Sequence, residues 1–318
     1  MFRIIGVFLL FLGSVFGLEP SYQLKMENNI IDVNYVENRL LVGTDFGEVI
    51  EVKFEKEFEN ITKKVVLKLP DISNFFGDFY PPKVFSVDFL EGRLLVNSEG
   101  SEGTKNLFVF KEQLEKLPIA LNIKKAAFVD KDKIFLGLMS NEILLYDLKD
   151  SKILYQKQLS EATFSDFTLS EDKKYFLVSC ESGILYYGKT LNGEILKEFS
   201  GLNKDNVYEA KMGFQGSDIV IIAAGQDRRV GVYFGNRMQD YTKEADFLVY
   251  SVGLSLDGKI GAYMKNEMSD IAVFEINGGK EMAILKGHKN LLNSIIFIDD
   301  KNIVSAEDGK NILFWKLP

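Results

Sequence analysis

A pattern that recurs about every 40–44 residues predicts an all-β fold, a seven-bladed β-propeller built from four-stranded antiparallel blades. Each copy contains an apolar strand, a short acidic or glycine-bearing turn, and a second β-rich strand. The chain shows no sustained helical periodicity after its first 17 residues, which argues against a mixed fold. The copies begin at residues 39, 93, 133, 175, 219, 259 and 302.

Two further strands complete each repeated unit. A short β-rich segment precedes every copy, and the two are joined by a turn such as SEDKK or SLDGK. A fourth strand follows most copies, for instance at 152–160, 194–200 and 281–287. The expected first strands are 30–36, 84–90, 124–130, 163–170, 207–214, 249–256 and 292–298.

The last unit is one strand short, because the chain ends at Pro318 after three strands. The segment 21–28 (SYQLKMEN) lies before the first unit and belongs to no other blade. An open ring would leave an unpaired strand edge at each end. We therefore predict that 21–28 pairs beside the strand of Trp315 and closes the propeller.

The N-terminus has the organisation of a signal peptide. Arg3 precedes an apolar run that is too short to cross a bilayer comfortably, and Val15 and Gly17 suit the −3 and −1 positions of a cleavage site. We expect residues 1–17 to be removed on export to the periplasm, leaving 18–318 as a single propeller domain. An uncleaved N-terminal anchor is the alternative.

Composition narrows the range of possible functions. The net charge of −8, or −9 once Arg3 is removed, disfavours nucleic-acid binding because phosphates would be repelled. Cys180 is the only cysteine, so no internal disulfide can form, and we expect a buried thiol. The chain has no CxxCH, no cysteine–histidine cluster and no nucleotide-binding glycine loop. We therefore expect no cofactor, no metal site and no catalytic residues.

The C-terminal segment 285–318 resembles the WD-repeat propeller family. In that family a Gly-His pair, a serine or threonine, an aspartate and a tryptophan form a hydrogen-bonded relay within a blade. The matching residues here are His288, Ser305, Asp308 and Trp315, although Asp308 comes one residue early. The resemblance implies a structural role for His288, whereas a metal ligand or a general base would need partners that the sequence does not place beside it.

The same resemblance implies that partners bind at the upper face, which carries the turns between second and third strands and the links between blades. These turns hold many acidic residues, and Asp45, Asp227 and Arg228 are candidate partner-binding residues among them. An acidic face could steer a basic partner. Alternatively, aspartate and glutamate simply occupy solvated turns.

An insertion between units one and two is the stronger candidate for a binding site. The unit starts are 54 residues apart here, and the extra residues, 71–82, read DISNFFGDFYPP. An aromatic loop on a propeller face suits the anchoring of a partner. The alternative is that its rings fold back onto blade one or two. The candidate anchors are Phe75, Phe76, Phe79 and Tyr80.

Together these features predict an exported, monomeric, non-catalytic propeller that binds a periplasmic or envelope protein, with no nucleic acid and no membrane span after signal cleavage. Its size, export and blade style are similar to those of the propeller accessory proteins of bacterial periplasmic nitrate reductases, which implies assistance to a molybdenum reductase. Propellers of outer-membrane assembly share the same design. A propeller hydrolase, of lactonase or glycosidase type, that uses carboxylates in the central channel is the alternative of another class.

Overall fold

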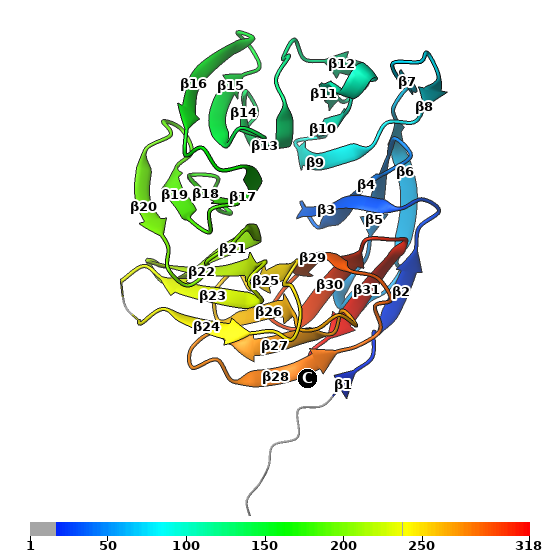
Figure 1. Cartoon of the computed structure of the whole chain (residues 1–318). Helices are drawn as coiled ribbons and strands as arrows, with labels where there is room; N and C mark the ends of the chain where they lie inside the picture. The colour runs from blue at the N-terminus through cyan, green and yellow to red at the C-terminus, as the bar shows by residue number, and fades with distance from the viewer. Residues whose placement is uncertain (1–16, 237) are drawn as a thin grey trace, which may run out of the picture.

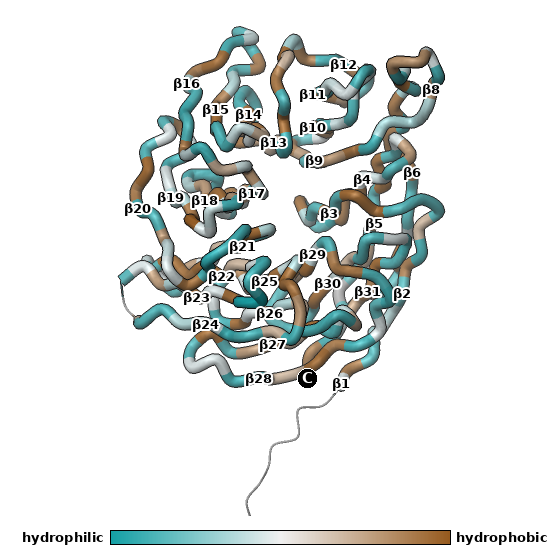
Figure 2. Tube along the Cα trace, viewed as in Figure 1, coloured by the Kyte–Doolittle hydropathy of each residue, from teal (hydrophilic) through white to brown (hydrophobic). Residues whose placement is uncertain are grey.

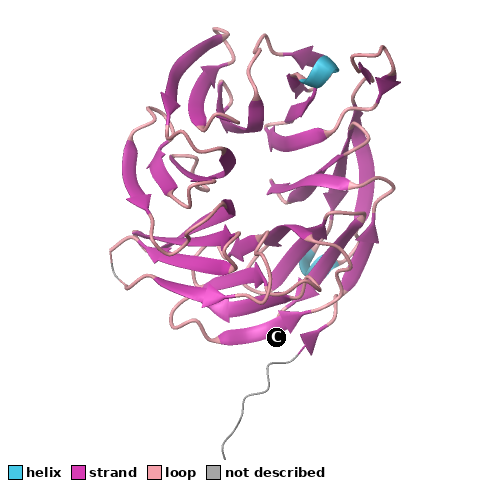
Figure 3. Cartoon of the chain, in the orientation of Figure 1, coloured by secondary structure: helices cyan, strands magenta, loops and turns pink. Residues whose placement is uncertain are grey.

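The computed structural model describes residues 17–236 and 238–318, so the predicted signal peptide lies outside the described residues except for Gly17. Seven large sheets surround a central channel and form a closed propeller (Figure 1). Strands and loops make up almost all of the described chain (Figure 3), apart from the 3-10 turns η1 (Lys56–Phe58) and η2 (Ser101–Gly103). Within the described ranges, no helix has the length and apolar character needed to span a membrane.

The strands of each blade follow chain order from the channel to the rim, except that strands from the N-terminal segment lie outermost in blades six and seven (Figure 1). Blade one contains β3 (Ile30–Val36), β4 (Arg39–Thr44), β5 (Glu48–Lys53) and β6 (Thr62–Lys68). Blade two contains β9 (Val84–Leu90), β10 (Arg93–Glu99), β11 (Lys105–Phe110) and β12 (Leu114–Lys116). Blade three contains β13 (Ile123–Asp130), β14 (Lys133–Leu138), β15 (Glu142–Asp147) and β16 (Lys152–Gln158). Blade four contains β17 (Phe164–Leu169), β18 (Tyr175–Cys180), β19 (Leu185–Lys189) and β20 (Ile195–Phe199).

The remaining three blades follow the same order. Blade five contains β21 (Val207–Gln215), β22 (Asp218–Gly225), β23 (Arg229–Phe234) and β24 (Tyr241–Glu244). Blade six contains β25 (Val252–Leu254), β26 (Ile260–Met264), β27 (Ile271–Glu275) and β28 (Glu281–Leu285). Blade seven contains β29 (Leu292–Phe297), β30 (Asn302–Glu307) and β31 (Asn311–Lys316). These positions confirm the predicted seven-unit arrangement.

The N-terminal segment closes the ring. Strand β2 (Tyr22–Lys25) pairs antiparallel with β31, in a register that sets Tyr22 opposite Phe314, and supplies the fourth strand of blade seven. This confirms the predicted closure. Strand β1 (Gly17–Leu18), which the sequence did not predict, pairs parallel with β28 and adds a fifth strand to blade six. The same N-terminal segment therefore fastens two neighbouring blades.

The core lies between adjacent blades, where the apolar faces of neighbouring sheets pack together. Phe135 of blade three, for instance, stacks on Phe176 of blade four with ring centroids 5.2 Å apart. Glycine is required where β4 meets β9 and where β14 meets β17. A Cβ atom added at Gly137 would lie 2.4 Å from the ring of Phe164, so only glycine permits this approach. Cys180 is buried in the same cluster as a free thiol.

Candidate functional site

The fold brings polar residues together in the central channel by means of a repeated irregularity. The innermost strands of five blades each contain a β-bulge near their start, and the residue after the bulge lines the channel. A bulge re-aims one side chain without ending the strand. The residues at this position are Asp32, Lys125, Asp166, Glu209 and Ser294.

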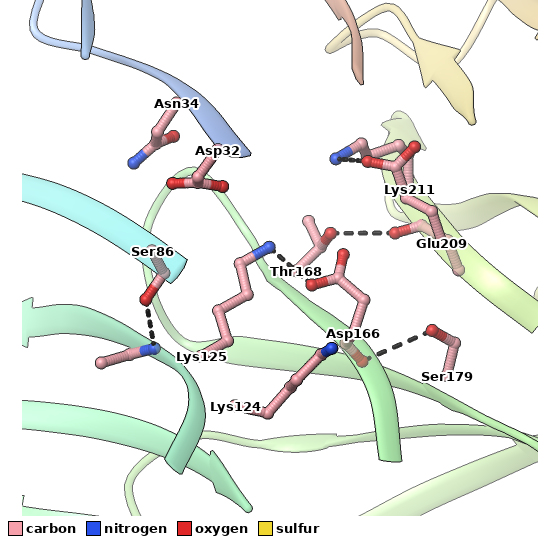
Figure 4. Close-up of polar contacts among 12 residues, drawn as sticks. Asp32, Asn34, Ser86, Lys124, Lys125, Asp166, Thr168, Ser179, Glu209 and Lys211 are labelled. Carbon is pink, nitrogen blue, oxygen red and sulfur yellow. Dashed lines mark hydrogen bonds and ion pairs between the residues drawn. The ribbon is translucent and has the colours of Figure 1, made fainter. Parts of the chain in front are cut away.

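Ion pairs and hydrogen bonds connect these channel residues to one another and to the next blade (Figure 4). The Lys125 Nζ atom lies 2.7 Å from Asp166 Oδ1, which joins blades three and four. Asp32 accepts a hydrogen bond from the backbone N–H of Val87 at 2.9 Å, which joins blades one and two. The channel groups thus satisfy backbone donors that the open edge of each innermost strand would otherwise leave unpaired.

A second set of contacts connects further pairs of neighbouring blades around the ring. Glu209 Oε2 accepts from the Ser251 hydroxyl at 2.7 Å and from the backbone N–H of Val252 at 3.0 Å. Its other oxygen lies 2.6 Å from Lys211 Nζ. Asp88, buried in blade two, accepts from the backbone N–H of Phe128 at 2.7 Å. Every one of these carboxylates therefore has a structural partner.

The channel shifts the acidity of its charged groups. Burial raises the pKa of Asp32 to about 6, even though Lys125 and the Val87 N–H favour the ionised form. Burial likewise raises the pKa of the Asp88 carboxyl. For Lys125, burial opposes the charge, but the carboxylates of Asp166 and Asp32 outweigh it and raise the pKa. Among the residues that the structure describes, no group of histidine, cysteine and acidic side chains could hold a metal ion.

The lower end of the channel widens into a hollow of about 580 Å³. Its walls come from the last residues of the innermost strands and include Tyr35, Phe167, Met212 and Leu254. Polar and apolar groups contribute about equally to these walls, and charged side chains such as Glu37, Glu171 and Lys173 come from the turns at the outer end. A hollow of this size can admit a small molecule.

The insertion at 71–82 forms a small hairpin on the upper face, between blades one and two (Figure 1). Strands β7 (Ile72–Ser73) and β8 (Phe79–Tyr80) pair only with each other, as a two-stranded sheet outside the blades. Brown segments in Figure 2 mark the hydrophobic residues of this hairpin at the rim of the ring. The exposed fractions of its phenylalanine side chains are 76% for Phe75, 91% for Phe76 and 74% for Phe79.

The rings therefore do not fold back onto the blades, with one exception at the base of the hairpin. Tyr80 is half-buried, and its hydroxyl donates a hydrogen bond to Glu99 Oε1 at 3.1 Å. Ile72 is buried on the same side of the hairpin. Of the four candidate anchors, the structure leaves three free for a partner and uses Tyr80 for attachment.

Asn74 fixes the tip of the hairpin. Its Oδ1 atom accepts from the backbone N–H groups of Phe76 at 2.8 Å and Asp78 at 3.0 Å. Its Nδ2 atom donates to the Asp78 carboxylate at 3.2 Å. Gly77 has a φ of 87°, a conformation that favours glycine. The tip is thus held in one shape by its own side chains.

The other candidate partner-binding residues lie elsewhere on the upper face and serve their own turns. Asp45 accepts from Asn29 through both its backbone N–H and its side-chain amide, at 3.0 and 2.7 Å. Asp227 accepts from the backbone N–H groups of Lys204 at 2.8 Å and Arg229 at 3.1 Å. Both carboxylates bind the link that precedes the first strand of their blade, which favours the alternative that acidic residues here are structural. Arg228 is exposed, in the left-handed backbone region with φ 63°.

The relay of blade seven contains three of the four expected residues. The His288 ring lies between Ser305 Oγ, 2.6 Å from Nε2, and Glu307 Oε2, 3.1 Å from Nδ1. Trp315 Nε1 donates to the same serine hydroxyl at 2.7 Å. Asp308 is exposed and takes no part, so the expectation for that residue is corrected. Side chains alternate along β30, and a residue two positions after Ser305 returns to its face, whereas Asp308 lies beyond the strand.

Blade five contains a related arrangement that was not predicted from the sequence. Tyr233 lies opposite Ile221 as Trp315 lies opposite Ile303, so the two aromatic residues occupy the same place in their blades. The Tyr233 hydroxyl accepts from the backbone N–H of Asn203 and donates to its side-chain oxygen, both at 3.2 Å. An aromatic residue at the same position of the third strand was the signal that could have revealed it.

Comparison with solved structures agrees with this architecture. The crystal structure of the WD40 β-propeller domain of Doa1 is similar over 93% of this chain and 96% of that domain, with a TM-score of 0.68 and 15% sequence identity. At that identity the likeness shows the fold, a β-propeller, and nothing about activity. No protein-family model and no curated protein sequence matches the chain.

Proposed function

We propose that this chain is an exported, non-catalytic propeller that binds a protein partner, and that the hairpin at 71–82 is its principal docking element. The observation that carries this proposal is the exposure of three phenylalanines on a hairpin of fixed shape. Clusters of solvent-exposed aromatic side chains are characteristic of interaction sites. Aromatic residues that become buried in an interface contribute much of its binding free energy.

A non-catalytic role agrees with the state of the channel. Hydrogen bonds or ion pairs to neighbouring blades engage Asp32, Asp88, Asp166 and Glu209, which gives these groups a structural purpose. The channel carboxylates accept hydrogen bonds from backbone N–H groups of the innermost strands, a role that requires no catalysis.

One observation favours the alternative function, a hydrolase that uses carboxylates of the channel. Burial raises the pKa of Asp32 to about 6, a value at which a carboxyl group can donate or accept a proton near neutrality. Assays with chromogenic lactones and glycosides, on the purified protein and on Asp32→Asn, distinguish the two functions. The binding proposal predicts no turnover by either protein.

Export to the periplasm and service to a respiratory reductase, such as a periplasmic nitrate reductase, remain proposals that rest on the sequence. The N-terminal run and the small residues at Val15 and Gly17 support export. Sequencing of the N-terminus of the protein recovered from the periplasm tests it, because cleavage after Gly17 would leave Leu18 as the first residue.

Replacement of residues 71–82 by a Gly-Ser linker of equal length tests the docking role. We expect the wild-type protein to recover a defined partner from an envelope extract, and the linker variant to lose that partner while it keeps its circular dichroism spectrum and its unfolding midpoint. Met268→Ser is a matched control, because Met268 is 68% exposed on an upper-face turn of blade six. Retention of the partner by the linker variant would reject the hairpin as its docking site.

A further inference from the structure

We infer that the hairpin recognises a protein surface in which an apolar socket is bordered by lysine or arginine residues, and that Phe76 is the side chain that enters the socket. This inference rests on the proposed function and specifies the chemistry of the partner. Three features of the hairpin carry it: the order of exposure of its rings, the rigidity of its tip, and the charge around its base.

Phe76 is the natural anchor because it is the more exposed of the two phenylalanines in the turn, at 91% against 76% for Phe75. Phe79, at the start of β8, is 74% exposed. A concave apolar site can cover all three rings at once, with the most exposed ring buried deepest. The partner surface therefore needs a socket of the size of a phenyl ring, with apolar shoulders for its neighbours.

The tip is already in its binding shape before a partner arrives. Both the Phe76 and Asp78 backbone N–H groups bond to Asn74, and the Ser73 N–H bonds to Ser101 Oγ at 3.2 Å in the adjacent turn η2. Ordering a loop on binding costs free energy, so a loop that is ordered in advance binds more tightly for the same contacts. Asn74 is in this respect a positioning residue for Phe76.

Acidic residues lie on the hairpin and beside its base. Asp71 and Asp78 are exposed on the hairpin itself, and Glu102 is exposed on η2, which the Ser73–Ser101 hydrogen bond holds against the hairpin. Lys83, just after the hairpin, is the nearest exposed base in the sequence. The local charge is therefore negative, like that of the whole chain, whose net charge is −8. Complementarity requires a partner with basic residues around its socket.

The same acidic frame argues for a protein partner over a membrane surface. Aromatic loops that dock on lipid are accompanied by lysine and arginine, which are attracted to anionic headgroups. Here docking of the rings would bring the carboxylates of Asp71, Asp78 and Glu102 towards those headgroups, which would repel them. A basic protein surface would be attracted by the same carboxylates that anionic headgroups would repel.

The experiment begins with a photo-crosslinking amino acid at position 76 of the full chain, to identify the partner and the residues that it contacts. Affinities are then measured with the two purified proteins. We expect Phe76→Ser to weaken binding by about 30-fold or more, as for a central aromatic anchor. We expect the double variant Asp78→Lys and Glu102→Lys to weaken it about tenfold at low salt, with the difference fading at about 0.5 M salt because of screening. Met268→Ser and Asp172→Lys, on other turns, are the matched controls and should bind as the wild type does.

The possible outcomes separate this inference from the proposed function. If Phe76→Ser weakens binding while the charge variant does not, the hairpin is the docking site but the basic border is wrong. If the partner binds equally well to Phe76→Ser, the socket is wrong as well, although the protein still binds a partner elsewhere. If the crosslinks form to lipid, and vesicles containing phosphatidylglycerol capture the wild type but not Phe76→Ser, a membrane is the target and the inference is overturned.

Discussion

At the scale of single residues, one serine hydroxyl links the only histidine and the only tryptophan of the chain. Ser305 Oγ lies 2.6 Å from the His288 ring and accepts a hydrogen bond from the Trp315 indole at 2.7 Å. His288, Ser305 and Trp315 are all buried. Buried polar groups are costly when they lack partners, so this arrangement stabilises blade seven only while it is complete.

Substitution of Ser305 by alanine should therefore destabilise the protein. The change leaves the indole N–H and an imidazole nitrogen without their partner, at a cost of about 1–3 kcal/mol. Chemical denaturation monitored by tryptophan fluorescence measures this, because Trp315 is the only tryptophan. Ser140→Ala removes a hydroxyl that contacts an exposed carboxylate, and it should change stability by much less.

The pH dependence of stability tests the role of Glu307, which contacts the His288 ring on the side opposite Ser305. Burial opposes the ionisation of Glu307, but hydrogen bonds from His288 and from three neighbouring N–H groups outweigh it and lower its pKa to about 2. A lowered pKa contributes stability above the unfolded-state value of about 4.5, and this contribution is lost as the pH falls from there towards 2. Its size is on the order of 3 kcal/mol.

Glu307→Gln should remove this contribution. We expect the variant to be less stable than the wild type at pH 7, and the difference to shrink steadily as the pH is lowered from about 4.5 to about 2. Asp308→Asn is the matched control, since Asp308 is the exposed neighbour. A constant difference between Glu307→Gln and the wild type across this range would contradict the structural role of the ionised carboxylate.

The sequence predicted three relay residues because histidine, serine and tryptophan matched a spacing. It did not predict Glu307, because the familiar motif places an aspartate in the turn, and only the alternation along β30 shows which acid faces the ring. Nor did it predict the channel contacts of Asp32 or Lys125. Those depend on bulges and on contacts between units about 40 residues apart or more, which no local pattern contains.

At the scale of elements, the sequence predicted that the hairpin exists but not how its side chains are placed. An excess of residues between units one and two predicted an aromatic insertion at 71–82. Composition alone could not decide whether its rings point outward, because that depends on which side chains the adjacent turn can cover. The structure resolves this through Tyr80, which bonds to Glu99, and through Phe76, which nothing covers.

Packing between neighbouring sheets gives an element-scale prediction. A methyl group at position 137 would lie 2.4 Å from the Phe164 ring of the next blade, and both groups are buried. Gly137→Ala must displace that ring, at a cost of about 1–3 kcal/mol. Ser140→Ala is the control, because Ser140 is exposed on the turn that follows the same strand. Equal unfolding midpoints for the two variants would contradict the packing described for blades three and four.

At the scale of the whole molecule, stability depends on closure of the ring by the N-terminal segment. Leu24 and Met26 are buried in the core that joins blades seven and one, and β2 covers the edge of β31. Loss of two such buried side chains costs several kcal/mol, since each contributes about 2–5 kcal/mol. The sequence predicted this closure from strand counting alone, whereas the parallel pairing of β1 was too short to be recognised.

Deletion of residues 18–28 should therefore lower the unfolding midpoint strongly and promote association through the exposed edge of β31. Deletion of residues 18 and 19 alone leaves β2 in place and should have a much smaller effect. Thermal unfolding and light scattering measure both consequences. Equal behaviour of the two shortened chains would mean that β2 does not hold the ring closed.

The central claim is that the exposed hairpin is the surface through which this propeller binds its partner. Hydroxyl-radical footprinting of the protein with and without the identified partner tests it most directly, because one experiment reads Phe76, Met268 and Leu191, which are exposed by 91%, 68% and 60%. We predict that the partner protects Phe76 strongly and leaves Met268 and Leu191 unchanged. Unchanged oxidation of Phe76, with protection at either of the other two residues, would contradict the claim.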